Sequence, residues 1–137
     1  MKSNDGLQAA MGLRALDTSA VQEFARLFER LFDERDYAGM AAYYAEDARL
    51  FAEHTAVVRG RSDIERFWKA AGERSDIRRS IEVHQVESSQ SLGCAVGVVK
   101  LELQGVPDQI KVNYVTVWRF HEDGLWRLTI DISSRAG

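Results

Sequence analysis

The sequence has 137 residues, a length that suits one domain able to bury a core without disulfide or metal support. Hydrophobic residues make up 45% of it and charged residues 28%, which argues against both a disordered chain and a membrane protein. A formal net charge of -3 argues against a nucleic-acid-binding surface, and a single cysteine cannot form an internal disulfide.

Short sequence motifs point to no cofactor. The sequence contains no Cys-x-x-Cys, His-Glu-x-x-His, glycine-rich phosphate loop or Gly-x-Ser-x-Gly motif, so we expect neither a metal nor another cofactor. No apolar run is long enough to span a membrane, and the N-terminal residues lack the hydrophobic stretch of a secretory signal. Together with the apolar neighbours of Cys94, these features predict a cytoplasmic protein without a membrane or nucleic-acid partner.

The N-terminal part of the sequence predicts an arm followed by an amphipathic helix. Residues 1–16 have no clear period and are expected to be a mobile arm, whereas residues 17–137 are expected to form a single domain. From Val21 to Phe32, apolar residues recur at steps of three and four, as on the buried side of a helix. The polar residues 33–36 should end this helix.

Two shorter helices are expected on either side of an extended segment. Residues 37–45 are predicted to be helical, and residues 48–52 are predicted to be extended. A third helix should begin within residues 60–63, where glycine, serine and aspartate favour a helix start. The buried side of this third helix would consist of Ile64, Phe67, Trp68 and Ala71.

After Gly72 the pattern changes to that of β-strands. Short turn-forming segments separate four long runs, which favours antiparallel neighbours joined by hairpins. In residues 92–103, the side chains that would point to either face of the strand include apolar ones. Both faces of this strand should therefore be covered. The helices can cover one face, and we expect a homodimer contact to cover the other. The four runs are residues 77–87, 92–103, 109–121 and 125–133.

Three phrases of the sequence match a known superfamily. They are YYAEDARLF at residues 43–51, VVRGRSDIERFW at residues 57–68 and VTVWRFHEDGLWRLTIDISS at residues 115–134. In these phrases, and in the order of its predicted elements, the sequence resembles the SnoaL-like and ketosteroid-isomerase-like branch of the nuclear transport factor 2-like superfamily. The resemblance implies an α+β fold: a cone-shaped, curled antiparallel sheet packed on about three N-terminal helices, with an apolar pocket between them.

The resemblance also provides a check for steroid isomerase chemistry. It implies a carboxylate base at the end of the first strand and a tyrosine in the first helix. The corresponding positions are occupied by Ala52 and Phe28, and neither side chain can transfer a proton or donate a hydrogen bond. Steroid isomerase activity is therefore not expected.

Two other residues are candidates for general acid–base catalysis. His54 carries an imidazole whose ordinary pKa suits both roles, although a lone histidine of this kind is more often an exposed turn residue. Asp131 places a carboxylate in an apolar strand, where it needs a partner. If Asp131 faces the pocket, its partner is a ligand. If Asp131 is structural, its partner is Arg127 or Arg119. The sequence favours the structural ion pair. Strict alternation puts Arg127, Thr129, Asp131 and Ser133 on one face of the last strand and Trp126, Leu128, Ile130 and Ile132 on the other.

Aromatic side chains are the candidates for a ligand-binding wall. Tyr114 and Trp118 share one face of the run at residues 109–121, and Tyr44 and Phe67 would face them from the helical part. The same pattern also suits an ordinary packed core.

Two hypotheses about function follow. The first is a domain that binds a small hydrophobic or aromatic molecule in an apolar pocket without transforming it. The second is a SnoaL-like cyclase, isomerase or hydrolase that uses Asp131 or His54 as general acid or base. An enzyme should bring two titratable groups within hydrogen-bond reach of one cavity, whereas a binding protein needs only shape and one or two donors.

Overall fold

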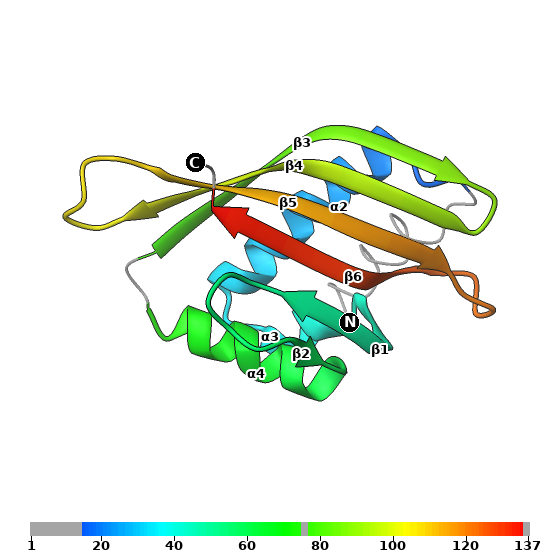
Figure 1. The fold of residues 1–137 in the computed structure, drawn as a ribbon, viewed down its shortest axis with the longest axis horizontal. Helices are drawn as coiled ribbons and strands as arrows, with labels where there is room; N and C mark the ends of the chain where they lie inside the picture. The colour runs from blue at the N-terminus through cyan, green and yellow to red at the C-terminus, as the bar shows by residue number, and fades with distance from the viewer. Residues whose placement is uncertain (1–14, 75–76, 136–137) are drawn as a thin grey trace.

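The structure, a computed structural model, describes residues 15–74 and 77–135. Apart from Ala15 and Leu16, the arm expected over residues 1–16 lies outside these described residues. The described chain contains three helices and six strands (Figure 1). Their bounds are α2 Thr18–Asp33, α3 Tyr37–Ala41, β1 Tyr44–Phe51, β2 Val58–Arg59, α4 Arg61–Gly72, β3 Ile77–Ser89, β4 Leu92–Leu103, β5 Ile110–Phe120 and β6 Trp126–Arg135.

The strands form one six-stranded sheet in the order β2-β1-β6-β5-β4-β3. β3 to β6 are an antiparallel meander, and β1 lies parallel to β6. α2 crosses one face of this meander, whereas α3 and α4 lie at the end that carries β1 and β2 (Figure 1). The curled, unclosed sheet packed on three helices confirms the predicted α+β fold.

α2 forms over the predicted apolar stripe and packs against the inner face of the sheet. The carboxylate of Asp17 caps its first turn by accepting a hydrogen bond from a backbone N–H at 2.8 Å. Phe24 meets Trp118 of β5 edge to face, with ring centroids 4.8 Å apart. Leu16 is only 2% exposed, and its carbonyl accepts a hydrogen bond from Ser88 of β3. These contacts hold the start of α2 on the sheet.

The second predicted helix is too long. α3 ends at Ala41, and β1 already begins at Tyr44. The Tyr44 carbonyl accepts two hydrogen bonds from the Arg61 guanidinium, at 3.0 and 2.7 Å, and the Tyr43 carbonyl accepts one from the backbone of Leu128 at 2.9 Å. Because these donors are distant in sequence, the local apolar period cannot show that the helix stops here.

A bulge in β6 changes which of its side chains face inward. The pairing of β6 with β5 skips Thr129, which is an extra residue in its strand. Before the bulge, Trp126 and Leu128 point inward and are each 1% exposed. After it, Asp131 points inward too, whereas Ile132 is 40% exposed. The expectation that Trp126 and Leu128 lie opposite Asp131 is therefore wrong, because the extra residue reverses the alternation.

Gly97 of β4 occupies a position where a side chain does not fit. β3 has its own extra residue, His84, beside this position. A Cβ atom at residue 97 would overlap the Glu82 carbonyl oxygen and lie 2.7 Å from the Tyr114 hydroxyl. The glycine therefore lets β3 and the Tyr114 ring lie close to β4.

Gly97→Ala should lower the free energy of unfolding by about 1–3 kcal/mol, because the added methyl group would push the neighbouring strand and ring away. Urea denaturation measures this loss. The control is Ser80→Ala, at an exposed position on β3, which should change stability by less than about 0.5 kcal/mol. A Gly97→Ala protein as stable as the wild type would contradict the close packing.

Candidate functional site

A cavity of about 100 Å³ lies between α2, α4 and the inner face of the sheet. Most of its wall is apolar, and a few charged or hydroxyl side chains interrupt that wall. Such a surface suits a small molecule with an apolar body and a few polar groups. The aromatic lining residues are Phe24, Phe28, Phe32, Tyr44, Phe67, Trp68 and Tyr114, and the remaining polar ones are Glu29, Arg79, Thr116, Asp131 and Ser133.

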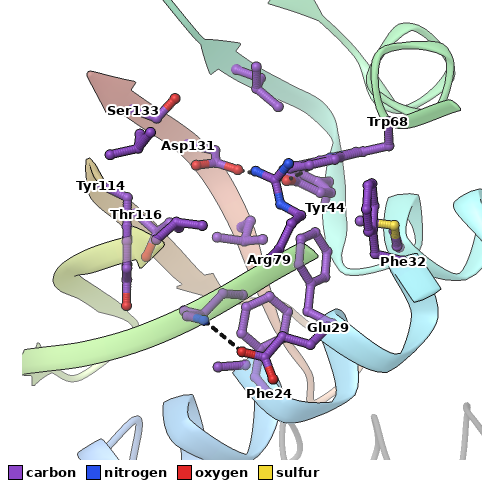
Figure 2. A pocket seen from close by; sticks show the side chains of 18 of the residues that line it. Phe24, Glu29, Phe32, Tyr44, Trp68, Arg79, Tyr114, Thr116, Asp131 and Ser133 are labelled. Carbon is purple, nitrogen blue, oxygen red and sulfur yellow. Dashed lines mark hydrogen bonds between the residues drawn. The ribbon is translucent and has the colours of Figure 1, made fainter. Parts of the chain in front are cut away.

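A chain of two hydrogen bonds crosses one end of the cavity. The indole Nε1 of Trp68, on α4, donates to the Tyr44 hydroxyl oxygen at 3.2 Å. The Tyr44 hydroxyl, on β1, in turn donates to Oδ2 of Asp131, on β6, at 2.7 Å (Figure 2). Tyr44 is fully buried, and Asp131 is half-buried. Two titratable groups therefore meet at the wall of one cavity.

Burial shifts the proton equilibria of this pair. It raises the pKa of Asp131 above its ordinary value, and the hydrogen bond from Tyr44 and the charge of Arg79 offset only part of that rise. Burial and the neighbouring Asp131 raise the pKa of Tyr44 well above its ordinary value. Tyr44 therefore remains a hydrogen-bond donor at neutral pH, and Asp131 is a stronger base than an exposed aspartate.

Arg79 supplies the positive charge of the cavity. It lies on the inner face of β3, and its guanidinium carbon is 4.9 Å from the ring centroid of Trp68 and 5.2 Å from that of Phe32. Burial lowers the pKa of Arg79, whereas the neighbouring Asp131 and Tyr44 raise it. Figure 2 shows the guanidinium between the aromatic rings and Asp131.

The other end of the cavity contains a second tyrosine. Tyr114 is 9% exposed, and its hydroxyl has no hydrogen-bond partner among the described residues. Burial raises the pKa of Tyr114 to about 12. Glu29, across the cavity on α2, accepts a hydrogen bond from the backbone N–H of Ile81 at 2.6 Å and pairs with Arg26 at 3.2 Å. Its carboxylate is thus engaged in holding α2 to β3, whereas the Tyr114 hydroxyl is buried beside Gly97 of β4.

The structure places the predicted site residues in three different settings. Tyr44, Phe67 and Tyr114 line the cavity, as does Asp131. Trp118 lies in the core behind the wall, where its indole donates to the Thr116 hydroxyl at 3.0 Å. His54 is exposed in the turn between β1 and β2 and is not among the lining residues.

The structural ion pair favoured for Asp131 is not formed. Arg127 pairs instead with Asp123, at 2.7 Å, and Arg119 is exposed on the outer side of β5. Among the described residues, the hydrogen-bond partner of Asp131 is Tyr44. The bulge explains the difference, because it turns Asp131 away from the side of the strand expected for it.

Sequence reasoning overlooked Arg79. The signal was present, because alternation along β3 puts residue 79 on the same face as the apolar residues Ile77 and Ile81. A charged residue in an inward-facing set usually has a specific partner. The partners here are aromatic rings from α2 and α4, which the sequence of the strand cannot reveal.

Comparison with known families gives a clear result. A family model described as a SnoaL-like domain matches residues 24–129. The chain belongs to the SnoaL-like domain family. The match ends just before Asp131, so the carboxylate in the cavity of this SnoaL-like domain is not among the matched residues.

Solved structures share the fold at low sequence identity. A domain of unknown function with a cystatin-like fold from Nostoc punctiforme is 20% identical, with a TM-score of 0.80 over 91% of this chain and 80% of that one. An NTF2-like protein of unknown function from Pseudomonas putida is 18% identical, with a TM-score of 0.72 over 85% and 84% of the two chains. A ketosteroid isomerase-like protein from Erwinia carotovora atroseptica is 14% identical, with a TM-score of 0.69 over 97% and 95%. These likenesses concern the fold alone, and no curated protein matches the sequence.

The described residues include neither a cluster suited to a metal ion nor a helix suited to a membrane. They contain no group of three or more histidine, cysteine, aspartate or glutamate side chains arranged to hold a metal ion. None of the described helices is long and apolar enough to cross a membrane.

The pKa of Asp131 predicts how its substitution affects stability. The folded protein holds the Asp131 proton more tightly than the unfolded chain, so this carboxyl contributes stability at low pH and loses it as pH rises to the folded pKa. Asp131→Asn removes the ionisation. The stability of this variant relative to the wild type should therefore increase as pH rises above about 4, the ordinary aspartate pKa, and level off above the folded pKa, as measured by urea denaturation at a series of pH values.

Asp123→Asn is the control, because the stability contributed by Asp123 should change with pH in the opposite direction. Asp123 is exposed, and its hydrogen bond with Arg127 lowers its pKa, so its contribution is present at neutral pH and lost as pH falls. The effect should be small because water screens the pair. Parallel pH profiles for the wild type and Asp131→Asn would contradict a buried carboxyl at residue 131.

Proposed function

We propose that this SnoaL-like domain binds a small apolar or aromatic molecule in its cavity and transfers a proton to or from it through Asp131. The observation that carries the proposal is the 2.7 Å hydrogen bond between Tyr44 and Asp131 at the wall of a largely apolar cavity. Two titratable groups within hydrogen-bond reach of one cavity are what an acid–base enzyme needs.

Asp131 suits the role of general base. An exposed aspartate is a weak base at neutral pH, and burial strengthens it by raising its pKa. The Tyr44 hydroxyl is bonded to Oδ2, and Oδ1 is the oxygen left for the reacting proton. Trp68 holds the Tyr44 hydroxyl in place, so the orientation of the carboxylate is set by contacts with two other elements.

The reaction class that fits is proton removal from carbon followed by proton return. The C–H bond breaks, the proton forms an O–H bond with Oδ1 of Asp131, and the electron pair remains on the substrate. Arg79 can stabilise the negative charge that then develops on a substrate oxygen. Return of the proton to a different atom gives an isomer and regenerates the carboxylate.

A second candidate is binding without chemistry. Phe28 and Ala52 occupy the positions where the family resemblance implies a tyrosine and a carboxylate base, and this favours a site that has no catalytic pair of that kind. On this hypothesis, Asp131 and the free hydroxyl of Tyr114 only hold polar groups of the ligand.

A generic substrate for carboxylate bases separates the two candidates. 5-Nitrobenzisoxazole loses a proton from carbon to give a coloured phenolate, so its turnover can be followed by absorbance. The wild type should accelerate this reaction, with a rate that rises with pH as Asp131 ionises. Asp131→Asn should reduce the rate at least about 100-fold, whereas His54→Ala, at an exposed turn, should leave it unchanged.

Tyr44→Phe tests whether Tyr44 positions the carboxylate of Asp131. The hydrogen bond from the Tyr44 hydroxyl favours the ionised carboxyl and so lowers the pKa of Asp131. Without it, the pH–rate profile should shift to higher pH. Binding of 5-nitrobenzisoxazole without turnover would support the non-catalytic candidate. Equal rates for the wild type and Asp131→Asn would contradict Asp131 as the base.

We also propose that two copies of the chain associate through the outer face of the sheet. Val96, Val115 and Ile132 lie in register across β4, β5 and β6. Val115 is 38% and Ile132 40% exposed. A row of apolar side chains across three strands favours a protein contact, and a second copy would cover it symmetrically.

Val115→Glu should prevent this association, because the dimer interface would bury an unpaired charge on each copy. Sedimentation equilibrium at micromolar concentration should give a dimer for the wild type and a monomer for the variant. The control is Val106→Glu, which adds the same charge at a 48% exposed valine in the turn between β4 and β5. A monomeric wild type, or a dimeric Val115→Glu protein, would contradict the proposed interface.

A further inference from the structure

Arg79 carries a charge that the cavity does not neutralise by direct contact. Its guanidinium carbon lies over the rings of Trp68 and Phe32, 4.9 Å and 5.2 Å from their centroids. A guanidinium carries five N–H donors in one plane. Among the described residues, Arg79 forms neither a hydrogen bond nor an ion pair within 4.0 Å.

The carboxylates that line the cavity have other partners. Glu29 is bonded to the backbone N–H of Ile81 and pairs with Arg26. Asp131 accepts the hydrogen bond from Tyr44 and acts on Arg79 only through its charge. Within residues 15–74 and 77–135, the Arg79 guanidinium thus has no hydrogen-bond or ion-pair partner, although polar groups in such a wall are expected to be satisfied.

We propose that Arg79 binds the carboxylate of a small aromatic acid whose ring lies against the aromatic wall of the cavity. A carboxylate is planar and can accept two parallel N–H···O bonds from the edge of a guanidinium. The lining side chains of Phe28, Phe67 and Trp68 offer apolar contacts for the ring. This inference rests on the proposed function only in placing the ligand in the same cavity.

The single arginine of the cavity favours a carboxylate over a phosphate. Arg79 is the one cationic lining residue within the described part of the chain. A phosphate carries more charge and more acceptor oxygens than one guanidinium can satisfy. A monocarboxylate matches the single positive charge of Arg79.

Two probes of the same shape show how much the negative charge of the ligand contributes to binding. Benzoate and benzamide are both planar and of similar size, but only benzoate is anionic. Titration of the wild type with each, followed by tryptophan fluorescence and by NMR, should give a dissociation constant at least about tenfold lower for benzoate. The fluorescence of Trp68 should change on binding, because its ring lies 4.9 Å from the guanidinium carbon of Arg79 and lines the cavity.

Variants of the two neighbouring arginines test the assignment. Arg79→Met keeps the aliphatic stem and removes the charge, so it should weaken benzoate binding about tenfold and leave benzamide binding unchanged. Arg78→Met is the matched control, because Arg78 is exposed on the same strand and faces the other way. It should retain the preference for benzoate. Arg79→Lys should restore part of the preference, because it restores the charge without the planar donors.

The proposal that Arg79 binds a carboxylate and the proposal that Asp131 transfers a proton can be contradicted independently. Asp131→Asn should keep or increase the preference for benzoate, because it removes a neighbouring negative charge, whereas the proposed function requires that it lose turnover of 5-nitrobenzisoxazole. Equal affinity of the wild type for the two probes, or no binding of benzoate, would overturn the proposal for Arg79 even if turnover is observed. An unchanged preference in Arg79→Met would also overturn it.

Discussion

The site depends on one extra residue in the last strand. Thr129 interrupts the pairing of β6 with β5, and its hydroxyl lies 3.2 Å from the Val117 carbonyl. On one side of this bulge, Trp126 and Leu128 fill the core, and on the other side Asp131 faces the cavity. In a regular strand, the carboxylate would lie on the face opposite these apolar residues. The bulge therefore places a charge-bearing group beside an apolar core without breaking the strand.

A carboxyl in such a place lowers stability unless other groups compensate. The Tyr44 hydroxyl supplies one hydrogen bond, and Trp68 in turn holds that hydroxyl. Arg61 fixes the backbone of Tyr44 through its two bonds to the carbonyl, so the tyrosine is anchored at both its backbone and its side chain. The charge of Arg79 offsets part of the remaining cost. The same groups that make the buried carboxyl tolerable also set its orientation and its proton affinity.

The fold alone does not determine what this cavity does. The structural relatives share the architecture at 20% identity or less, and two of those compared are themselves of unknown function. Phe28 and Ala52 differ from the isomerase pattern implied by the resemblance. The hydroxyl and the carboxylate of this chain come instead from β1 and β6.

Local sequence determined most of the architecture. The apolar period from Val21 to Phe32 predicted α2, and β4 occupies the predicted residues 92–103, because helices and strands repeat their side-chain directions at different intervals. Strand alternation also placed Tyr114 on the inner face. Only the tertiary structure decided the partner of Asp131 and the role of Arg79. A bulge arises from pairing with a neighbouring strand, and the inward Arg79 lies beside rings that other elements supply. Both depend on residues far apart in the chain, so no local period records them.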